Sequence, residues 1–209
     1  MQHFKEGDTD GIFQFERAQV KSMLTKIECD CFEDVIAINS MNRPGPLSLG
    51  MPDLYANNKK NQDNLVKNAY YEYTKETYGT LIYQEQIQQI CVNMAGMEWN
   101  DADAVMKMMK SNVGSREARR IEEESGILRQ KFLEGAKKNG INVDEAMDTY
   151  DKLLTYSFNK GHAAGYSLIS VEEMFYKVYY PTEFWFAKMK FAKDLAELDK
   201  FSCFAAQSG

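Results

Sequence analysis

The sequence predicts a mainly helical protein made of several helices, with one or two short extended segments. The first observation behind this prediction is helical spacing of apolar residues, which is clearest in residues 86–96: Ile87, Ile90, Cys91 and Met94. The second is the scarcity of strand-like runs, since only TLIY (80–83) and GIFQF (11–15) qualify. The third is size, because 209 residues with 44% hydrophobic content can bury the core of one domain or of two small ones.

Capping residues and apolar stripes delimit the other predicted helices. These are expected at 100–109, from Ser115 to about 136, from Asp144, from Asn159, and from Pro181 to about 198. The prolines of RPGP (43–46) predict a rigid, non-helical turn, because each fixes its own backbone and restricts the residue before it. The polar, Asn-rich stretch 56–70 predicts an exposed loop.

Composition excludes several classes of protein. The sequence shows neither a run of about 20 apolar residues nor the apolar block of a signal peptide, so we expect a cytosolic protein without a membrane partner. The four cysteines, Cys29, Cys31, Cys91 and Cys203, fit neither a disulfide framework nor a zinc site. We therefore expect reduced thiols and no metal ligands.

Charge is distributed unevenly along the chain. The net charge is −6, yet residues 107–138 hold nine Lys and Arg against five Asp and Glu. Arg116, Arg119 and Arg120 fall on the outer face of the helix predicted there. Two interpretations stay open: an ordinary solvated helix surface, or a surface that follows a nucleic-acid backbone.

The segment FNKGHAAGYSLIS (158–170) combines small residues with a lysine and a histidine. A helix capped by Asn159 places Asn159, His162, Tyr166 and Ser170 on one face. Gly161, Ala164, Gly165 and Leu168 fall on the other. The small face is expected to pack tightly against another helix, and the polar face to stay open. Free amides at the helix start, together with Lys160, suit a phosphate, although simple packing explains the same residues.

Seven segments in this order and spacing resemble the alpha subunit of bacterial DNA polymerase III, the family C replicative polymerases. They are GDTDGIFQFE (7–16), CFEDVIAINSMNRPGPLSLGM (31–51), ETYGTLIYQEQIQQI (76–90), the helix at 101–110, FLEGAKKNGI (132–141), FNKGHAAGYSLIS (158–170) and YYPTEF (179–184). The resemblance implies the helical fingers module, which closes over the incoming dNTP and the templating base. Residues 1–16 are then an extended lead-in, 17–192 the fingers, and 193–209 the end of the last helix and a tail.

The resemblance also implies partners: a primer–template, a dNTP and the palm-containing remainder of a DNA-directed DNA polymerase. In this family the catalytic Mg²⁺ ions are held by palm aspartates that do not occur in this chain, so the chain alone is expected to be inactive and to supply no catalytic residue. Asp8 and Asp10 imitate the spacing of a metal site, but they fall in a turn-like GDTDG segment.

Candidate binding residues follow from the same comparison. The residues expected at the dNTP phosphates and the nascent base pair are Asn159, Lys160, His162, Tyr166, Lys107 and Lys110. Those expected at the template or DNA are Arg43, Tyr83, Gln84, Gln86, Arg116, Arg119 and Arg120. A rigid corner is an equally good explanation for Arg43. A capped helix start is an equally good explanation for residues 83–86.

The chain departs from the family where paired arginines are replaced by Met106 and Lys107, which removes bidentate phosphate geometry. Ser111 and Asn112 replace further lysines, and Gly161 replaces a serine. An alternative function is therefore a non-catalytic DNA-binding or scaffold module of a phage or mobile element that keeps the fingers fold. A neighbouring reading frame that encodes the palm aspartates would favour the polymerase.

Overall fold

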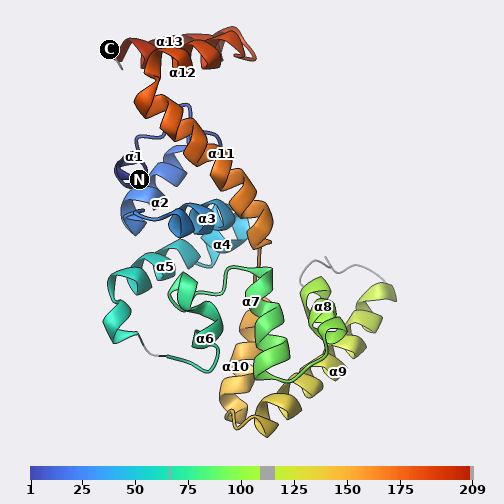
Figure 1. Ribbon diagram of the computed structural model, residues 1–209. Coiled ribbons are helices and arrows are strands. Elements are labelled where there is room, and N and C mark those ends of the chain that lie inside the picture. Colours follow the sequence, from blue (N-terminus) through green and yellow to red (C-terminus); the bar gives the residue numbers. More distant parts are fainter. Residues whose placement is uncertain (66, 109–115, 208–209) are drawn as a thin grey trace. The chain divides into compact units, whose positions relative to one another are not determined.

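Helices form almost all of the regular structure, which confirms the predicted fold class (Figure 1). The computed structural model describes residues 1–65, 67–108 and 116–207, and side chains in 116–123 are not among those described. The chain divides into a first unit, Met1–Asn42 with Gly161–Gly209, and a second unit, Arg43–Lys160. Within the described ranges, extended pairing is limited to one parallel bridge between Tyr83 and Phe158. None of the described helices has the length and apolarity of a membrane span.

The first unit is built from helices at both ends of the chain. They are α1 (Gln2–Glu6), α2 (Ala18–Ile27), α3 (Phe32–Met41), α11 (Lys160–Tyr179, after its first residue), α12 (Pro181–Lys190) and α13 (Leu195–Gln207). Helix α11 buries Ala163, Ser167, Ser170 and Met174. Ser170 Oγ donates to the carbonyl of Phe13 (2.9 Å), and the Asn39 amide donates to Ser167 Oγ (3.3 Å). Small polar residues therefore join α11 to α3 and to the segment that follows α1.

Residues 11–15 are not extended, so that prediction is wrong. The N–H of Ile12 donates to the carbonyl of Thr9 (3.1 Å), and the N–H of Phe15 donates to that of Ile12 (3.0 Å), which makes a series of turns. Ile12 and Phe15 are both fully buried, while Gln14 has a φ of 66°. Turns, rather than strand alternation, place these two side chains in the core, and the lead-in 1–16 is helical and turn-like instead of extended.

The last predicted helix is two helices. Helix α12 begins at Pro181 as expected but ends at Lys190, and residues 195–207 form α13 instead of a tail. Asp194 Oδ1 accepts from the N–H of Glu197 (2.8 Å), and the Glu197 carboxylate accepts from the N–H of Lys193 (2.8 Å). This reciprocal capping starts a new helix. Trp185 of α12 packs near Phe204 of α13, with ring centroids 5.8 Å apart.

The second unit contains the middle of the chain. Its helices are α4 (Pro44–Ser48), α5 (Met51–Lys60), α6 (Tyr71–Thr74), α7 (Gln84–Gln89), α8 (Trp99–Met108), α9 (Arg116–Lys138) and α10 (Val143–Leu153), with 3₁₀ turns at Gln62–Asn64 and Lys75–Thr77. Ile87, Val105, Phe132 and Tyr150 belong to its core. Cys91 lies there too, and burial raises the pKa of its thiol to about 12. All four cysteines are free, but Cys203 is exposed rather than part of a core.

Three local predictions in the second unit are wrong. Residues 43–46 begin a helix, because a proline at the first helical position, here Pro44, loses no hydrogen bond. The predicted loop 56–70 is helical as far as Lys60. Helix α10 is capped by Asn142 rather than Asp144, since the Asn142 side chain accepts from the N–H groups of Asp144 and Glu145. In the first and third cases a capping or first-turn residue was assigned the wrong position.

Helix α7 continues as a π-helix over Ile90–Met94 and ends near Gly96, whose φ is 63°. The backbone there lies against α9, because a Cβ added to Gly135 would be only 1.7 Å from the carbonyl oxygen of Ala95. Only glycine allows so close an approach. This contact fixes α9 against the end of α7 inside the second unit.

Candidate functional site

The start of α11 is positioned by a short backbone ladder in the second unit. The N–H of Phe158 donates to the carbonyl of Ile82 (2.8 Å), and the N–H of Gln84 donates to the carbonyl of Phe158 (2.9 Å). This pairing aligns the residues before α11 with the residues before α7. It therefore brings two of the sequence segments proposed as binding elements, 83–86 and 158–160, into direct contact.

The Glu85 carboxylate accepts hydrogen bonds from the first backbone N–H of α11. The N–H of Lys160 donates to both carboxylate oxygens (3.1 Å each), and the side-chain amide of Asn159 donates to Oε1 (2.9 Å). An anionic group is favoured at a helix N-terminus by the unpaired amides and by the helix dipole. The start of α11 thus holds an oxyanion in this structure, and that oxyanion comes from the chain itself.

The Lys160 ammonium is also paired within the second unit. It forms an ion pair with the Glu76 carboxylate and lies 5.4 Å from the centroid of the Tyr83 ring. About a third of the Lys160 side chain is exposed. The ammonium is therefore reachable from solvent, and its carboxylate partner is exchangeable because surface ion pairs contribute little.

Arg43 lies over an aromatic ring. Its guanidinium carbon is 4.2 Å from the centroid of the Phe158 ring, which is a close cation–π contact. Burial raises the pKa of the neighbouring Tyr156 to about 12, although the charge of Arg43 and its hydrogen bond to the phenol act in the opposite direction. Arg43 is exposed at the start of α4, so its positive charge is accessible from solvent.

Gln86 is part of the protein interior. Only 2% of the residue is exposed. Its Oε1 accepts from the N–H groups of Ile82 (2.9 Å) and Tyr83 (3.0 Å), while its Nε2 donates to Thr77 Oγ1 (2.8 Å). Tyr83 is equally buried, and Gln84 is half-buried. In this conformation Gln86 and Tyr83 serve the capped helix start, which was one of the two explanations left open.

The packed and open faces of α11 differ from the predicted ones. Gly165 and Leu168 are exposed, and a Cβ added to Gly165 would meet no atom within 4 Å. Ser170, expected on the open face, is buried. The prediction failed because the buried stripe follows Ala163, Ser167, Ser170 and Met174, which are small or flexible rather than strongly apolar.

His162 and Tyr166 are exposed in the first unit and lie together, with ring centroids 4.5 Å apart. The Tyr166 ring also stacks on Phe13, at 5.4 Å. These contacts hold both polar side chains on one turn of α11, as the helical spacing predicted.

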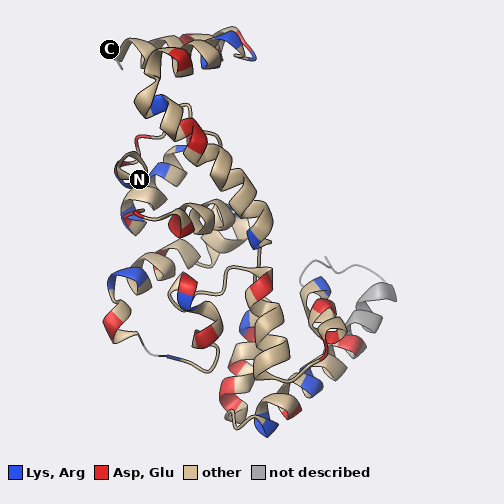
Figure 2. Cartoon of the chain, viewed as in Figure 1, with Lys and Arg blue, Asp and Glu red and all other residues tan. Residues whose placement is uncertain are grey.

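Of the remaining predicted cations, Lys107 lies on α8, and Arg116, Arg119 and Arg120 lie on α9. Lys107 is exposed in the last turn of α8. Lys110 and the side chains of Arg116, Arg119 and Arg120 lie outside the described residues. In the described part of α9, basic and acidic residues are mixed (Figure 2). There Lys131 pairs with Asp101 of α8 (2.9 Å) and Arg129 lies near Asp151 of α10 (3.8 Å), so part of the basic charge is balanced inside the second unit.

Asp8 and Asp10 lie in a turn, as predicted, and each is paired with a lysine. Asp8 accepts from Lys177 (2.6 Å) and contacts His3 (2.9 Å), and Asp10 accepts from Lys21 (2.7 Å). Burial raises the pKa of Asp8, but the hydrogen bonds and charges of Lys177 and His3 outweigh it and lower the pKa below the usual range. Both carboxylates thus stabilise the first unit.

A metal site is not evident among the described residues. The one cluster with suitable spacing is Asp30, Cys31 and Asp34. Asp34 is fully buried, and its Oδ2 accepts from the N–H groups of Asp30 (3.0 Å) and Cys31 (3.4 Å) at the start of α3. A thiol also suits Mg²⁺ poorly, since Mg²⁺ prefers oxygen ligands. This cluster is a helix cap, and it does not fit the catalytic metal of a polymerase.

Comparison with known proteins identifies the family. Residues 1–140 match the model of the bacterial DNA polymerase III alpha subunit finger domain. Similar proteins named DNA polymerase III subunit alpha occur in Buchnera aphidicola (34% identity over 94% of this chain), Escherichia coli K12 (34% over 92%) and Pseudomonas aeruginosa (35% over 94%). The chain belongs to this finger-domain family. It spans 17% of the length of each of these three relatives.

Two residues of the site were not among the candidates from the sequence. Glu85 falls within the segment 83–86, but no sequence pattern indicates that it reaches the start of α11. Glu76 carries no sequence signal, since it lies 84 residues from Lys160. Contacts over such distances follow from the tertiary structure.

Proposed function

We propose that this chain is the fingers segment of a DNA-directed DNA polymerase, which binds the incoming dNTP and the primer–template and closes over them. One observation carries the proposal: the start of α11 already holds an oxyanion, the Glu85 carboxylate, at its first amide and beside a partly exposed ammonium. A triphosphate is a stronger ligand of the same kind, because it presents more charge and more acceptor oxygens.

Displacement is central to this proposal. The triphosphate replaces the Glu85 carboxylate at the amide of Lys160 and competes with Glu76 for its ammonium. His162 and Lys107, both exposed, then add further donors. Such positioning and charge neutralisation are the main demands of phosphoryl transfer.

Other residues have supporting roles in the proposal. Lys110, outside the described residues, supplies a further cation to the phosphates, and Tyr166 packs at the nascent base pair. Arg43, Gln84, Arg116, Arg119 and Arg120 contact the template or DNA backbone. Catalysis requires the palm-containing remainder of a polymerase, whose aspartates hold Mg²⁺, so the isolated chain binds without reacting.

The test is a calorimetric titration of the 209-residue chain with dATP and Mg²⁺. We expect Lys160→Ala to weaken binding by about tenfold, the loss typical of a hydrogen bond to a charged group, and Lys107→Ala to weaken it by a smaller factor. Lys137→Ala is the matched control, since Lys137 is an exposed lysine in the last turn of α9. Binding that is indifferent to both Lys160→Ala and Lys107→Ala would show that the site assignment is wrong.

A further inference from the structure

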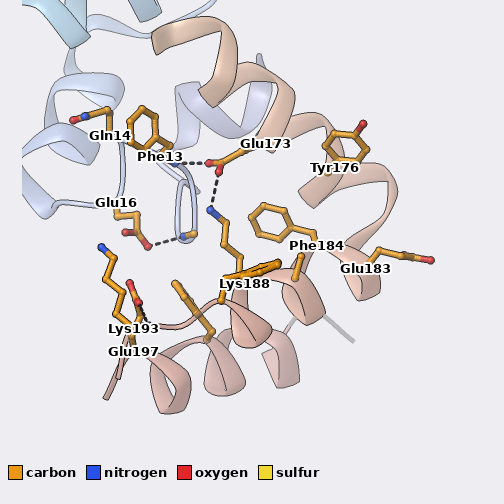
Figure 3. A pocket seen from close by; sticks show the side chains of 14 residues that line it. Phe13, Gln14, Glu16, Glu173, Tyr176, Glu183, Phe184, Lys188, Lys193 and Glu197 are labelled. Atoms are coloured by element: carbon orange, nitrogen blue, oxygen red, sulfur yellow. Dashed lines mark hydrogen bonds and ion pairs between the residues drawn. The ribbon is translucent and has the colours of Figure 1, made fainter. Parts of the chain in front are cut away.

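Arg43 contacts aromatic side chains instead of a carboxylate. Figure 3 shows a different arrangement in the first unit, where the Lys188 ammonium lies against the Glu173 carboxylate (2.8 Å). Among the described residues no carboxylate pairs with Arg43, whose guanidinium contacts the ring of Phe158 and the phenol of Tyr156. An anion can therefore bind Arg43 without displacing an internal carboxylate.

The Phe158 ring is a fixed platform for the guanidinium. The guanidinium carbon of Arg43 lies 4.2 Å from the ring centroid. The backbone of Phe158 is held on both sides, because its N–H donates to the carbonyl of Ile82 (2.8 Å) and its carbonyl accepts from the N–H of Gln84 (2.9 Å). A cation over the face of an aromatic ring is attracted by the ring quadrupole, so a fixed ring favours one position of the guanidinium.

The backbone of Arg43 is restricted as well. It is extended, with a φ of −144° and a ψ of 154°, as expected for a residue that precedes a proline. Its carbonyl accepts from the N–H of Leu47 (3.1 Å) in α4. A Cβ added to Gly45 would lie 3.6 Å from the Tyr156 ring, so this turn lies against Tyr156. The arginine and its aromatic neighbours thus have fixed positions within the second unit.

The phenol of Tyr156 orients the guanidinium. Arginine only donates hydrogen bonds, so the phenol oxygen is the acceptor in the bond between Arg43 and Tyr156. Burial raises the pKa of Tyr156 to about 12, so the phenol is neutral near pH 7 and adds no competing negative charge. A guanidinium has more N–H donors than one phenol can accept, and Arg43 is exposed. The remaining donors suit a phosphate, which arginine binds through two parallel hydrogen bonds.

We propose that Phe158 and Tyr156 are positioning residues, which hold the Arg43 guanidinium for a contact with a phosphate of DNA through two hydrogen bonds. A free arginine side chain loses conformational freedom when it binds a phosphate, and one already held by a ring and a phenol loses less. This proposal rests on the function proposed above, in which Arg43 contacts the DNA backbone. It adds that two uncharged side chains determine the strength of that contact.

The test is a double-mutant cycle on the 209-residue chain, in which fluorescence anisotropy measures binding to a labelled primer–template. We expect Arg43→Ala to weaken binding by about tenfold, the loss typical of a hydrogen bond to a charged group. Phe158→Leu should weaken it by about threefold, because a cation–π contact at an exposed site contributes modestly. In the Arg43→Ala background Phe158→Leu should have no further effect. An equal loss in both backgrounds would show that the ring has only a structural role and would overturn the proposal.

Tyr156→Phe keeps the ring, removes the phenol oxygen and decides the cycle if Phe158→Leu disturbs folding. It should weaken binding by about threefold in the presence of Arg43, as for the loss of one hydrogen bond, and have no effect in its absence. Arg17→Ala, at an exposed arginine of the first unit, is the charge control and should weaken binding by less than about twofold.

Salt dependence supplies a second measurement. Arg43→Ala should reduce the slope of log affinity against log salt concentration by about one, because one phosphate contact is lost. Arg43→Lys keeps the charge and should preserve the slope, but it should bind about threefold more weakly because lysine lacks the planar pair of donors. Equal affinity of Arg43→Lys and the unsubstituted chain would overturn the proposal.

Failure of this proposal differs from failure of the role assigned to Arg43 above. If Arg43→Ala binds the primer–template as tightly as the unsubstituted chain, Arg43 does not contact DNA and both are wrong. If Arg43→Ala weakens binding but the effects of Phe158→Leu and Tyr156→Phe add to it, the DNA contact remains and only the positioning role is overturned.

Discussion

Two regions of the molecule differ in how their charged and aromatic side chains are used. One is the contact between the starts of α7 and α11 in the second unit, and the other is the aromatic surface around Phe191 in the first unit. In the second unit, the glutamates at 76 and 85 and the amide of Gln86 are all engaged by the chain itself. In the first unit, large rings such as Phe191 are left uncovered, and Glu183 is exposed in the first turn of α12. In the second unit a ligand has to displace an internal partner, whereas the exposed rings of the first unit are accessible without such a displacement.

This difference changes how the family motifs are read. YQEQ looks like a contact element in the sequence, yet two of its four side chains are buried and a third holds the start of α11. Among the candidates, Arg43, Lys107, Asn159, His162 and Tyr166 are exposed, and Lys160 is about one third exposed. A motif therefore combines residues that position a site with residues that contact the ligand, and burial separates the two.

The largest change in the stability of the second unit is expected for a substitution at Gly135. We expect Gly135→Ala to lower the free energy of unfolding by about 3 kcal/mol, because the new methyl group collides with the backbone carbonyl of Ala95. Gly126→Ala on the same helix meets no atom within 4 Å and should raise stability by about 0.5–1 kcal/mol. Urea unfolding of both variants measures this, and changes of the same sign would contradict the close approach of α9.

The internal network around Gln86 gives the next largest effect. Gln86→Ala leaves the N–H groups of Ile82 and Tyr83 without their acceptor and should cost about 2 kcal/mol of unfolding free energy. Gln89→Ala, at an exposed position of the same helix, should change stability by less than about 0.5 kcal/mol. If the two variants are equally stable in urea, Gln86 is not a structural residue and its contact with DNA becomes the better explanation.

The carboxylate at the start of α11 sharpens the comparison through binding. Glu85→Gln keeps an oxygen acceptor for the N–H of Lys160 but removes the competing negative charge. We expect the affinity for dATP and Mg²⁺ to rise by about fivefold, as for the loss of one unfavourable surface charge interaction of about 1 kcal/mol. Glu98→Gln, at an exposed glutamate of the second unit, is the calorimetric control. Weaker binding by Glu85→Gln would mean that the carboxylate positions the helix instead of competing with the phosphates.

The smallest effect on stability is expected for a substitution at the exposed Phe191. Phe191→Ser should change the free energy of unfolding by less than about 0.5 kcal/mol, because its ring is 76% exposed and buries little area. Urea unfolding of the variant and of the unsubstituted chain measures this change. A large loss of stability would show that the Phe191 ring belongs to the core and is not exposed.

Much of the fold followed from local patterns. The stripe of Ile87, Ile90, Cys91 and Met94 and the capping residues near 100 and 159 located their helices correctly, because helical periodicity and capping act over a few residues. Errors arose where one local rule replaced another. Pro44 begins a helix instead of preventing one, and the capping pair Asp194 and Glu197 divides a helix that periodicity alone would continue.

Less of the site was predictable. Lys160 at the beginning of a helix was foreseen, but the carboxylates that hold its amide and its ammonium were not. The buried face of α11 was also assigned to the wrong residues, because serine and alanine stripes resemble a polar or neutral surface in a sequence. Only neighbouring elements such as Asn39 and Phe13 show that Ser167 and Ser170 are satisfied in the interior.

The sequence by itself determined the helical class, the finger-domain family and the chemical character of the cationic helix start, since these depend on residue types and short spacings. The tertiary structure decided which members of each motif are buried, which anion occupies the first turn of α11, and which aromatic rings of the first unit stay exposed. The physical reason is the sequence distance over which each interaction acts. Periodicity and capping act over a few residues, whereas burial and charge pairing depend on segments far apart in the sequence, such as Glu76 with Lys160 and Phe13 with Glu173.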